Sequence, residues 1–305
     1  MTFNPNARID TSHVTQRAGG GGSLGGRIAI GGGGIGVVGF IVVLLIQAFT
    51  GTDLSGLAGS YGGATSGGGT SLSGCSTGQD ANTNDKCLVA GTADSLDAFW
   101  SATLQGNGYP YESVDTVVLF SGSTSTACGT GTTDMGPFYC PNDRTIYLDT
   151  GFYQELKTQF GASAGQLAKE YVVAHEWGHH IQNLLGTMSD LDLSDTGPTS
   201  DSVRLELQAD CYAGAWVKDA STTKDASGTA LLQPPTQDQL DDALNAAMVV
   251  GDDYIEKNLG SGTVTPEQWT HGSSKARQLW FTSGYQQGVG GCDTFGASAD
   301  EVDPQ

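Results

Sequence analysis

The sequence predicts an α+β domain that is mainly helical, contains a small sheet and is preceded by a single transmembrane helix. Three observations support this fold class. An uncharged apolar run occupies residues 28–49, helical spacing of apolar residues recurs beyond residue 90, and only two short segments have the composition of strands. The about 230 residues from 75 to 305 are enough for one domain with a substantial core.

The apolar run from residue 28 to residue 49 is predicted to span a membrane. As a helix rising about 1.5 Å per residue it is about 33 Å long, which crosses a bilayer core. Arg8, Arg17 and Arg27 precede it, so the positive-inside rule places a disordered segment, 1–27, in the cytoplasm. A cleaved signal peptide is the alternative. An uncleaved anchor is favoured because the run exceeds the about 7 to 15 apolar residues of such peptides.

Residues 50–74 are dominated by Gly, Ser and Thr, and this composition predicts a flexible linker. It connects the anchor to an extracytoplasmic domain of residues 75–305. The formal net charge of −20 argues against nucleic acid as a partner.

Apolar periodicity and punctuating Gly, Pro, Asn and Asp residues set the expected elements. Helices are predicted near residues 95–105, 152–160, 164–185, 200–219, 237–258 and 266–287. Strands are predicted at 116–120 and 145–148, where β-branched and aromatic residues cluster. The strand at 145–148 is expected to bind the backbone of a substrate as an added strand.

The helix at 164–185 contains His175 and His179 one turn apart, with Glu176 after the first histidine. Positions i and i+4 share a helix face, so both imidazoles can bind one metal ion. A zinc ion held there activates water for attack on a carbonyl group, and Glu176 can accept the proton. The pattern predicts one Zn²⁺ per chain and peptide-bond hydrolysis. Two solvated histidines on an ordinary helix are disfavoured because the segment is mostly apolar, and His180 lies off the ligand face.

Glu206 and Asp210 lie one turn apart on the helix predicted at 200–219. Their neighbours are apolar, and an unpaired carboxylate there would be costly. Glu206 is the predicted third metal ligand, and Asp210 is predicted to accept a hydrogen bond from a ligand histidine. The alternative, a solvated Glu206 and an ordinary salt bridge for Asp210, is disfavoured by the nearby HExxH pattern.

Four stretches resemble a known family, and they read YVVAHEWGHHIQ, SVRLELQADCYAGAW, GPFYCPNDRTIYLD and THGSSKARQLWFTSGY. The chain resembles the neutral zinc metallopeptidases of YpfJ type, which belong with the glutamate-liganded zincins. The resemblance implies a zincin-like metallopeptidase domain that cleaves peptide or protein substrates. It implies His175, His179 and Glu206 as zinc ligands and Glu176 as the general base.

The ExxxD pattern of Glu206 and Asp210 is also similar to that of CAAX prenyl proteases. Those enzymes carry a His and an Arg six positions apart in a later segment, and His271 and Arg277 have this spacing. The resemblance implies that His271 hydrogen-bonds the tetrahedral intermediate and that Arg277 organises acidic groups beside the ligands. Gly272 stands where these relatives have Pro. The alternative is that His271 caps a helix.

The even set of 6 cysteines agrees with an extracytoplasmic domain, because disulfides persist in oxidising compartments. Short sequence intervals favour two of the pairs, and the third follows. The expected disulfides are Cys75–Cys87, Cys128–Cys140 and Cys211–Cys292. A cysteine-rich zinc site is disfavoured because no CxxC spacing occurs.

Taken together, the patterns predict a membrane-anchored zinc endopeptidase whose catalytic domain lies outside the cytoplasm. One alternative is a catalytically inactive zincin-fold protein that acts as a binding or scaffold protein of the cell envelope. Another is an envelope protein with a structural zinc. The latter is disfavoured because structural zinc usually has four protein ligands rather than three and an open position.

Overall fold

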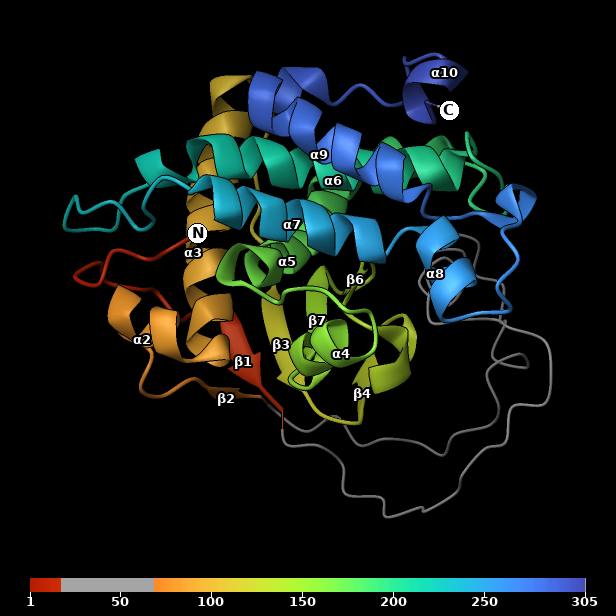
Figure 1. Ribbon diagram of the computed structural model, residues 1–305. Coiled ribbons are helices and arrows are strands. Elements are labelled where there is room, and N and C mark those ends of the chain that lie inside the picture. Colours follow the sequence, from red (N-terminus) through yellow and green to blue (C-terminus); the bar gives the residue numbers. More distant parts are fainter. Residues whose placement is uncertain (18–68, 305) are drawn as a thin grey trace.

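The computed structural model describes residues 1–17 and 69–304, which form a small sheet covered by helices (Figure 1). The helices are α2 (Gly78–Thr83), α3 (Asp85–Gly106), α4 (Phe152–Thr158), α5 (Gln166–Leu184), α6 (Asp201–Asp219), α7 (Gln237–Val249), α8 (Asp252–Asn258), α9 (Ser274–Gln287) and α10 (Ala299–Val302). The strands are β1 (Val14–Gln16), β2 (Thr70–Ser71), β3 (Thr116–Phe120), β4 (Ser123–Thr126), β5 (Gly129–Thr132), β6 (Phe138–Cys140) and β7 (Thr145–Asp149). The predicted α+β class with a small sheet is confirmed.

The main sheet has the strand order β2-β1-β3-β7-β6. β1, β3 and β7 run parallel, whereas β2 and β6 are antiparallel to their neighbours. β7 is therefore paired on both sides, and it cannot accept a substrate as a further strand. The expectation that residues 145–148 bind the substrate backbone is wrong for this reason, and the edge beside the site helices belongs to β6.

The first 17 residues pack into the domain. β1 pairs in parallel with β3 and in antiparallel with β2, while Met1, Phe3 and Ala7 are fully buried. The expected disorder of 1–27 is thus wrong for residues 1–17, and the domain is not confined to 75–305.

The predicted transmembrane helix, 28–49, lies outside the described residues. Across residues 1–17 and 69–304, no helix is long and apolar enough to cross a membrane.

Local capping residues set the helices that frame the site. The Ser200 side chain accepts a hydrogen bond from Val203 N at the start of α6, and the Ser273 side chain accepts one from Ala276 N at the start of α9. α9 thus begins well after the expected residue 266, and its cap is Ser273. The hypothesis that His271 caps this helix is wrong. Similarly, the helix expected at 237–258 is divided into α7 and α8, and Gly251 is the N-cap residue of α8.

Glycines allow the site helices to approach one another closely. A Cβ atom at Gly178 of α5 would lie 3.0 Å from the Ala209 Cα atom of α6. Where α6 crosses α9, a Cβ at Gly214 would lie 2.0 Å from Phe281 O. Larger residues at these two positions would push the helices apart, and the side chains of α5, α6 and α9 could no longer meet.

The three expected disulfides are present, and they are Cys75–Cys87, Cys128–Cys140 and Cys211–Cys292. The third bond connects α6 to the segment that follows α9, over a sequence separation of 81 residues. It therefore fixes the helix that carries Glu206 against the C-terminal part of the domain.

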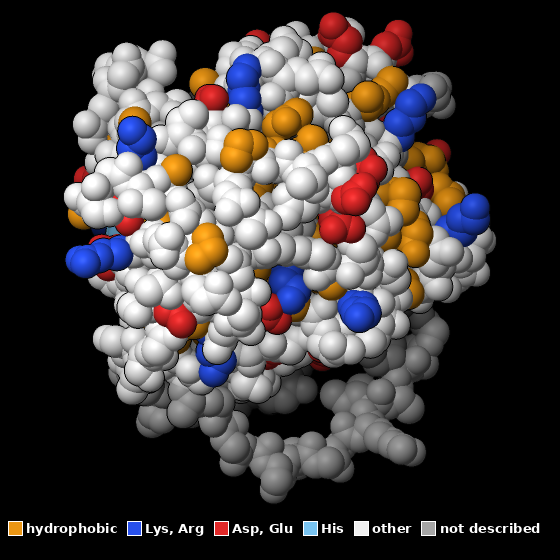
Figure 2. All heavy atoms as spheres, turned by 60° about the vertical axis from the view of Figure 1, so that its left-hand side comes forward, with side chains coloured by type: hydrophobic (Ala, Val, Ile, Leu, Met, Phe, Trp, Pro, Cys, Tyr) orange, Lys and Arg blue, Asp and Glu red, His pale blue; other side chains and the backbone are white. Residues whose placement is uncertain are grey.

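The formal charge of the chain is −20, and its basic groups are few. On the face shown in Figure 2, Lys and Arg side chains are separated from one another, so its described residues form no continuous basic surface. The absence of a nucleic-acid partner stays a prediction.

Candidate active site

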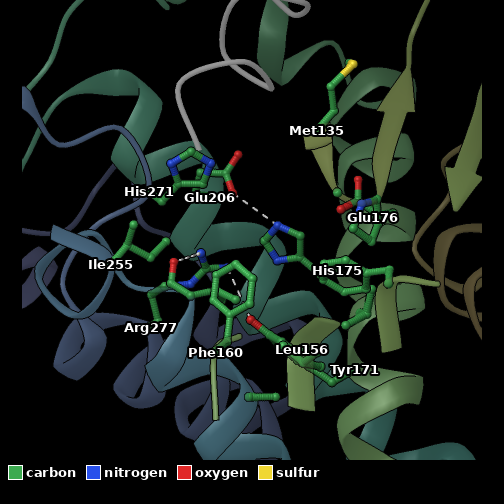
Figure 3. Close-up of a pocket in the computed structure, with 16 residues that line it drawn as sticks. Met135, Leu156, Phe160, Tyr171, His175, Glu176, Glu206, Ile255, His271 and Arg277 are labelled. Carbon is green, nitrogen blue, oxygen red and sulfur yellow. Dashed lines mark hydrogen bonds and ion pairs between the residues drawn. The ribbon is translucent and has the colours of Figure 1, made fainter. Parts of the chain in front are cut away.

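Three buried donor groups from α5 and α6 converge on one point. His175 Nε2 lies 3.1 Å from Glu206 Oε2, and His179 Nε2 lies 3.4 Å from Glu206 Oε1. The ligand atoms of the three residues all lie within 4.8 Å of one another. Figure 3 shows the His175 ring directed toward the Glu206 carboxylate.

This arrangement fits a zinc ion. Ligand atoms about 2.0 to 2.2 Å from a tetrahedral zinc are about 3.3 Å apart, and the two observed separations lie close to this spacing. Glu206 Oε1 is also buried and accepts no hydrogen bond within the described part of the chain. A cation at this point would satisfy the oxygen, which is otherwise costly to bury.

Each histidine is held by its other ring nitrogen. His175 Nδ1 lies 2.8 Å from Asp210 Oδ1, and a carboxylate oxygen can only accept, so Nδ1 carries the proton. His179 Nδ1 lies 2.8 Å from Gln182 Oε1. The Gln182 amide is oriented because its Nε2 donates to Leu205 O at 2.7 Å. Both Nε2 atoms therefore carry no proton, and each has a lone pair that can bind a metal ion.

Asp210 connects the histidine to Arg277 on α9. Arg277 donates from Nε to Asp210 Oδ2 at 2.8 Å and from Nη2 to Oδ1 at 3.0 Å, and the Tyr171 hydroxyl donates to Oδ1 at 2.5 Å. Burial raises the pKa of Asp210, but Arg277 and His175 lower it further, so the net pKa is below the usual range. The carboxylate therefore stays charged and can accept from His175. Arg277 thus contacts Asp210, an acidic group beside the ligands, as the resemblance to CAAX prenyl proteases implied.

Glu176 points into the same cavity as the ligands (Figure 3). Its Oε2 atom is buried and has no hydrogen-bond partner among the residues described. Burial raises the pKa of Glu176 above its usual range, against the opposing effects of His179 and His175. A carboxylate with a raised pKa is a better proton acceptor at neutral pH than an exposed one.

His271 lies in the loop between α8 and α9 and is 4% exposed. Its Nδ1 atom lies 2.9 Å from Thr270 Oγ1, whereas its Nε2 atom is buried without a hydrogen-bond partner in the described chain. The ring lies beside Glu206 at the cavity wall (Figure 3). Gly272 has a φ of +90°, which proline cannot adopt because its ring fixes φ near about −65°. A proline could therefore not take the place of Gly272 without a change in the backbone of this chain.

The chain matches a protein-family model described as "Putative neutral zinc metallopeptidase" over residues 5–295. The chain belongs to this zinc metallopeptidase family. The resemblance inferred from the sequence is confirmed, and it extends over nearly the whole chain, including the part of the N-terminal segment that precedes β1.

Two relatives illustrate the reach of the neutral zinc metallopeptidase family. "Uncharacterized protein YpfJ" of Escherichia coli is 35% identical over 309 residues, which cover 98% of this chain and 100% of the relative. "Uncharacterized protein Rv2575" of Mycobacterium tuberculosis is 49% identical over 229 residues, which cover 74% of this chain and 76% of the relative. No solved structure matches the chain.

Sequence reasoning missed two residues that orient the predicted site of this family member. Gln182 follows His179 by three positions, so helical spacing alone could have identified it as a partner for that ring. Asp252, at the start of α8, accepts three backbone N–H groups of the 270–272 loop through Oδ2, at 2.7 to 3.0 Å. No local signal marks Asp252, because its partners are about twenty positions away and are backbone groups.

His180 is not part of the site, as expected. Its Nδ1 lies 3.0 Å from the Tyr139 hydroxyl of β6, and its Nε2 lies 2.8 Å from Glu112 O. Burial lowers the pKa of His180 to about 4, so the ring is neutral at physiological pH. Through its hydrogen bond with Tyr139, His180 connects the edge strand β6 to α5, the helix that carries the histidine ligands.

Proposed function

We propose that the chain is a zinc-dependent endopeptidase of the cell envelope that hydrolyses peptide bonds. One observation carries this proposal. The donor atoms of His175, His179 and Glu206 lie within 4.8 Å of one another. The cavity beside them is lined by His175 and Glu206, by Glu176 and by His271, whose Nε2 atom has no partner among the described residues. A structural metal site needs neither an adjacent base nor a further hydrogen-bond donor.

His175, His179 and Glu206 would hold one zinc ion per chain, which when bound supplies Lewis acidity toward the scissile carbonyl and a water molecule. Glu176 accepts a proton from the attacking water as the new carbon–oxygen bond forms. It then transfers that proton to the leaving nitrogen as the carbon–nitrogen bond breaks. His271 donates from Nε2 to the carbonyl oxygen while that oxygen carries negative charge.

β6 provides the surface for the substrate backbone. It is the terminal strand of the sheet, and Gly136 and Pro137, directly before it, line the cavity. A peptide added to this edge would pass the metal ligands in an extended conformation. The bond between Tyr139 and His180 supports this arrangement, because it holds β6 at a fixed distance from α5.

We propose that the domain works outside the cytoplasm and is attached to the membrane through residues 28–49. The three disulfides support an oxidising compartment. We infer that residues 1–17 lie on the same side of the membrane as the domain, because β1 pairs with β2 and β3 and strands of one sheet cannot be separated by a bilayer. The proposal therefore does not include a cytoplasmic N-terminus.

Hydrolysis by the purified full-length chain in detergent tests the proposed function. Glu176→Gln removes the proton acceptor but no ligand, so we expect unchanged zinc content and a fall in turnover of about a hundred- to ten-thousandfold. The substrate is an unfolded protein such as casein, and Glu155→Gln, on α4, is the matched control. Equal rates for wild type and Glu176→Gln would refute the proposal. A zinc-loaded wild-type chain without any hydrolysis would instead support the inactive binding protein.

A further inference from the structure

The cavity at the metal ligands extends well beyond them. His175, Glu176 and Glu206 form one end, and the rest is formed by residues of α4, α5, α7, α8 and α9, by residues 135–137 and by the loops that hold Phe160 and His271. In the view of Figure 3, Phe160 and Ile255 lie on one side of the His175 ring and Met135 lies on the other.

The wall away from the metal ligands is apolar. α4 contributes Phe152 and Leu156, which are one helical turn apart and face the cavity together. Ala246 and Val250, also one turn apart at the end of α7, contribute further apolar lining. Phe160 lies between α4 and α5 and also lines the space.

The polar lining groups are already committed to the reaction centre. Arg277 is bound in two places by Asp210, and the Tyr171 hydroxyl donates to the same carboxylate. The remaining charged or imidazole groups of the lining are His175, Glu176, Glu206 and His271, which all belong to the catalytic constellation. At the described apolar wall, away from the reaction centre, a polar guest would therefore lose water without gaining a partner.

We propose that this space is a specificity pocket for one bulky apolar side chain, aromatic or branched aliphatic, of the residue on one side of the scissile bond. The inference rests on the proposed function, because a carbonyl carbon placed at the reaction centre carries its neighbouring side chain into the adjoining space. Burial of an apolar side chain there stabilises the complex in proportion to the area removed from water. A charged side chain at the same position is rejected for want of a partner.

Ala246 and Phe160 are the residues that set the size of the pocket. Ala246 is small and 1% exposed, so Ala246→Leu fills the space from the α7 side. Phe160 presents a ring to the cavity, while its carbonyl accepts a hydrogen bond from the Tyr254 hydroxyl at 2.9 Å. Phe160→Ala therefore enlarges the pocket and retains the contact that holds its backbone. The two substitutions should shift the preferred size of the guest in opposite directions.

A series of internally quenched peptides tests the proposal. Ala, Val, Leu, Phe, Asp and Lys are placed in turn on either side of the scissile bond, and kcat/KM is measured for each. At one of the two positions we expect Leu or Phe to exceed Ala, and to exceed Asp and Lys further, by about 10 to 200-fold. Ala246→Leu should transfer the preference toward Val and Ala, and Phe160→Ala should favour Phe over Leu. Asp241→Leu, on the exposed face of α7, is the matched control.

Binding of the same peptides to the Glu176→Gln variant gives a second readout that needs no turnover. The order of dissociation constants should follow the order of kcat/KM. If peptides are cleaved but neither position shows an apolar preference, or if Ala246→Leu and Phe160→Ala leave the preference unchanged, the pocket is refuted and the endopeptidase stands. If nothing is cleaved, the proposed function fails, and binding that does not discriminate Phe from Asp would then overturn the pocket as well.

Discussion

Asp210 is expected to contribute more to the stability of the fold than to metal affinity. Its two oxygens accept from Tyr171, from His175 and twice from Arg277, and neither Asp210 nor Arg277 is more than 3% exposed. Asp210→Asn preserves the shape of the side chain and removes its charge. The guanidinium group of Arg277 then stays buried without a counter-charge.

The structure sets the size of this effect. Breaking a buried ion pair on one side costs about 3 to 5 kcal/mol in unfolding free energy. Loss of a group that orients a metal ligand costs about 10 to 100-fold in affinity, equivalent to about 1.4 to 2.7 kcal/mol. The loss in stability should thus be the larger one, and it should appear without any metal.

Urea unfolding in the presence of a chelator separates the two effects, because it compares metal-free proteins. Asp210→Asn should lower the unfolding free energy by about 3 to 5 kcal/mol. The double variant Asp210→Asn with Arg277→Met should lose less unfolding free energy than the sum of the losses in the two single variants, since it removes both charges. A metal-free Asp210→Asn within about 1 kcal/mol of wild type would refute the reasoning.

Three further predictions follow from individual residues. His271→Ala should retain zinc and lower kcat by about a hundred- to a thousandfold, because it removes one donor to the developing oxyanion, and an unchanged kcat would remove His271 from the site. Burial raises the pKa of Asp94 to about 6, above its value in the unfolded chain. The stability that protonation of Asp94 gives to the folded state is therefore fully present below about pH 4 and is lost as the pH rises through about 6. Asp94→Asn should therefore melt at a higher temperature than wild type at pH 8 and at a similar temperature at pH 4, and equal shifts at both pH values would contradict this cause. Ser12→Cys, at an exposed position before β1, should react with a membrane-impermeant maleimide on intact cells, whereas labelling only after lysis would place residues 1–17 in the cytoplasm.

The site residues that could be predicted from the sequence are those that lie one turn apart on the same helix. His175, Glu176 and His179 share one helix, and Glu206 and Asp210 share another, so helical periodicity places their side chains before any packing is known. The structure brings both groups together at the point where Gly178 lets α5 and α6 meet. Ends of helices were less predictable, because Ser273 and Gly251 override the apolar rhythm around them.

The unpredicted part depends on contacts between distant segments. β1 is only three residues long, and its partners in β2 and β3 are more than fifty positions away, so nothing nearby marks it as a strand. The choice between β6 and β7 as the edge strand is also a property of the whole sheet. Local composition predicts a strand at 145–148 but none at 138–140, so it does not indicate that β6 forms the edge beside β7.

The central claim is that His175, His179 and Glu206 together hold a catalytic zinc ion with an open coordination position. Diffraction from crystals of the purified protein, recorded on both sides of the zinc absorption edge, tests this claim most directly. We expect one anomalous peak per chain, at about 2.0 to 2.2 Å from both Nε2 atoms and from a Glu206 oxygen, with no fourth protein ligand. A zinc peak elsewhere in the chain, or a zinc bound at the two histidines with Glu206 turned away, would contradict it.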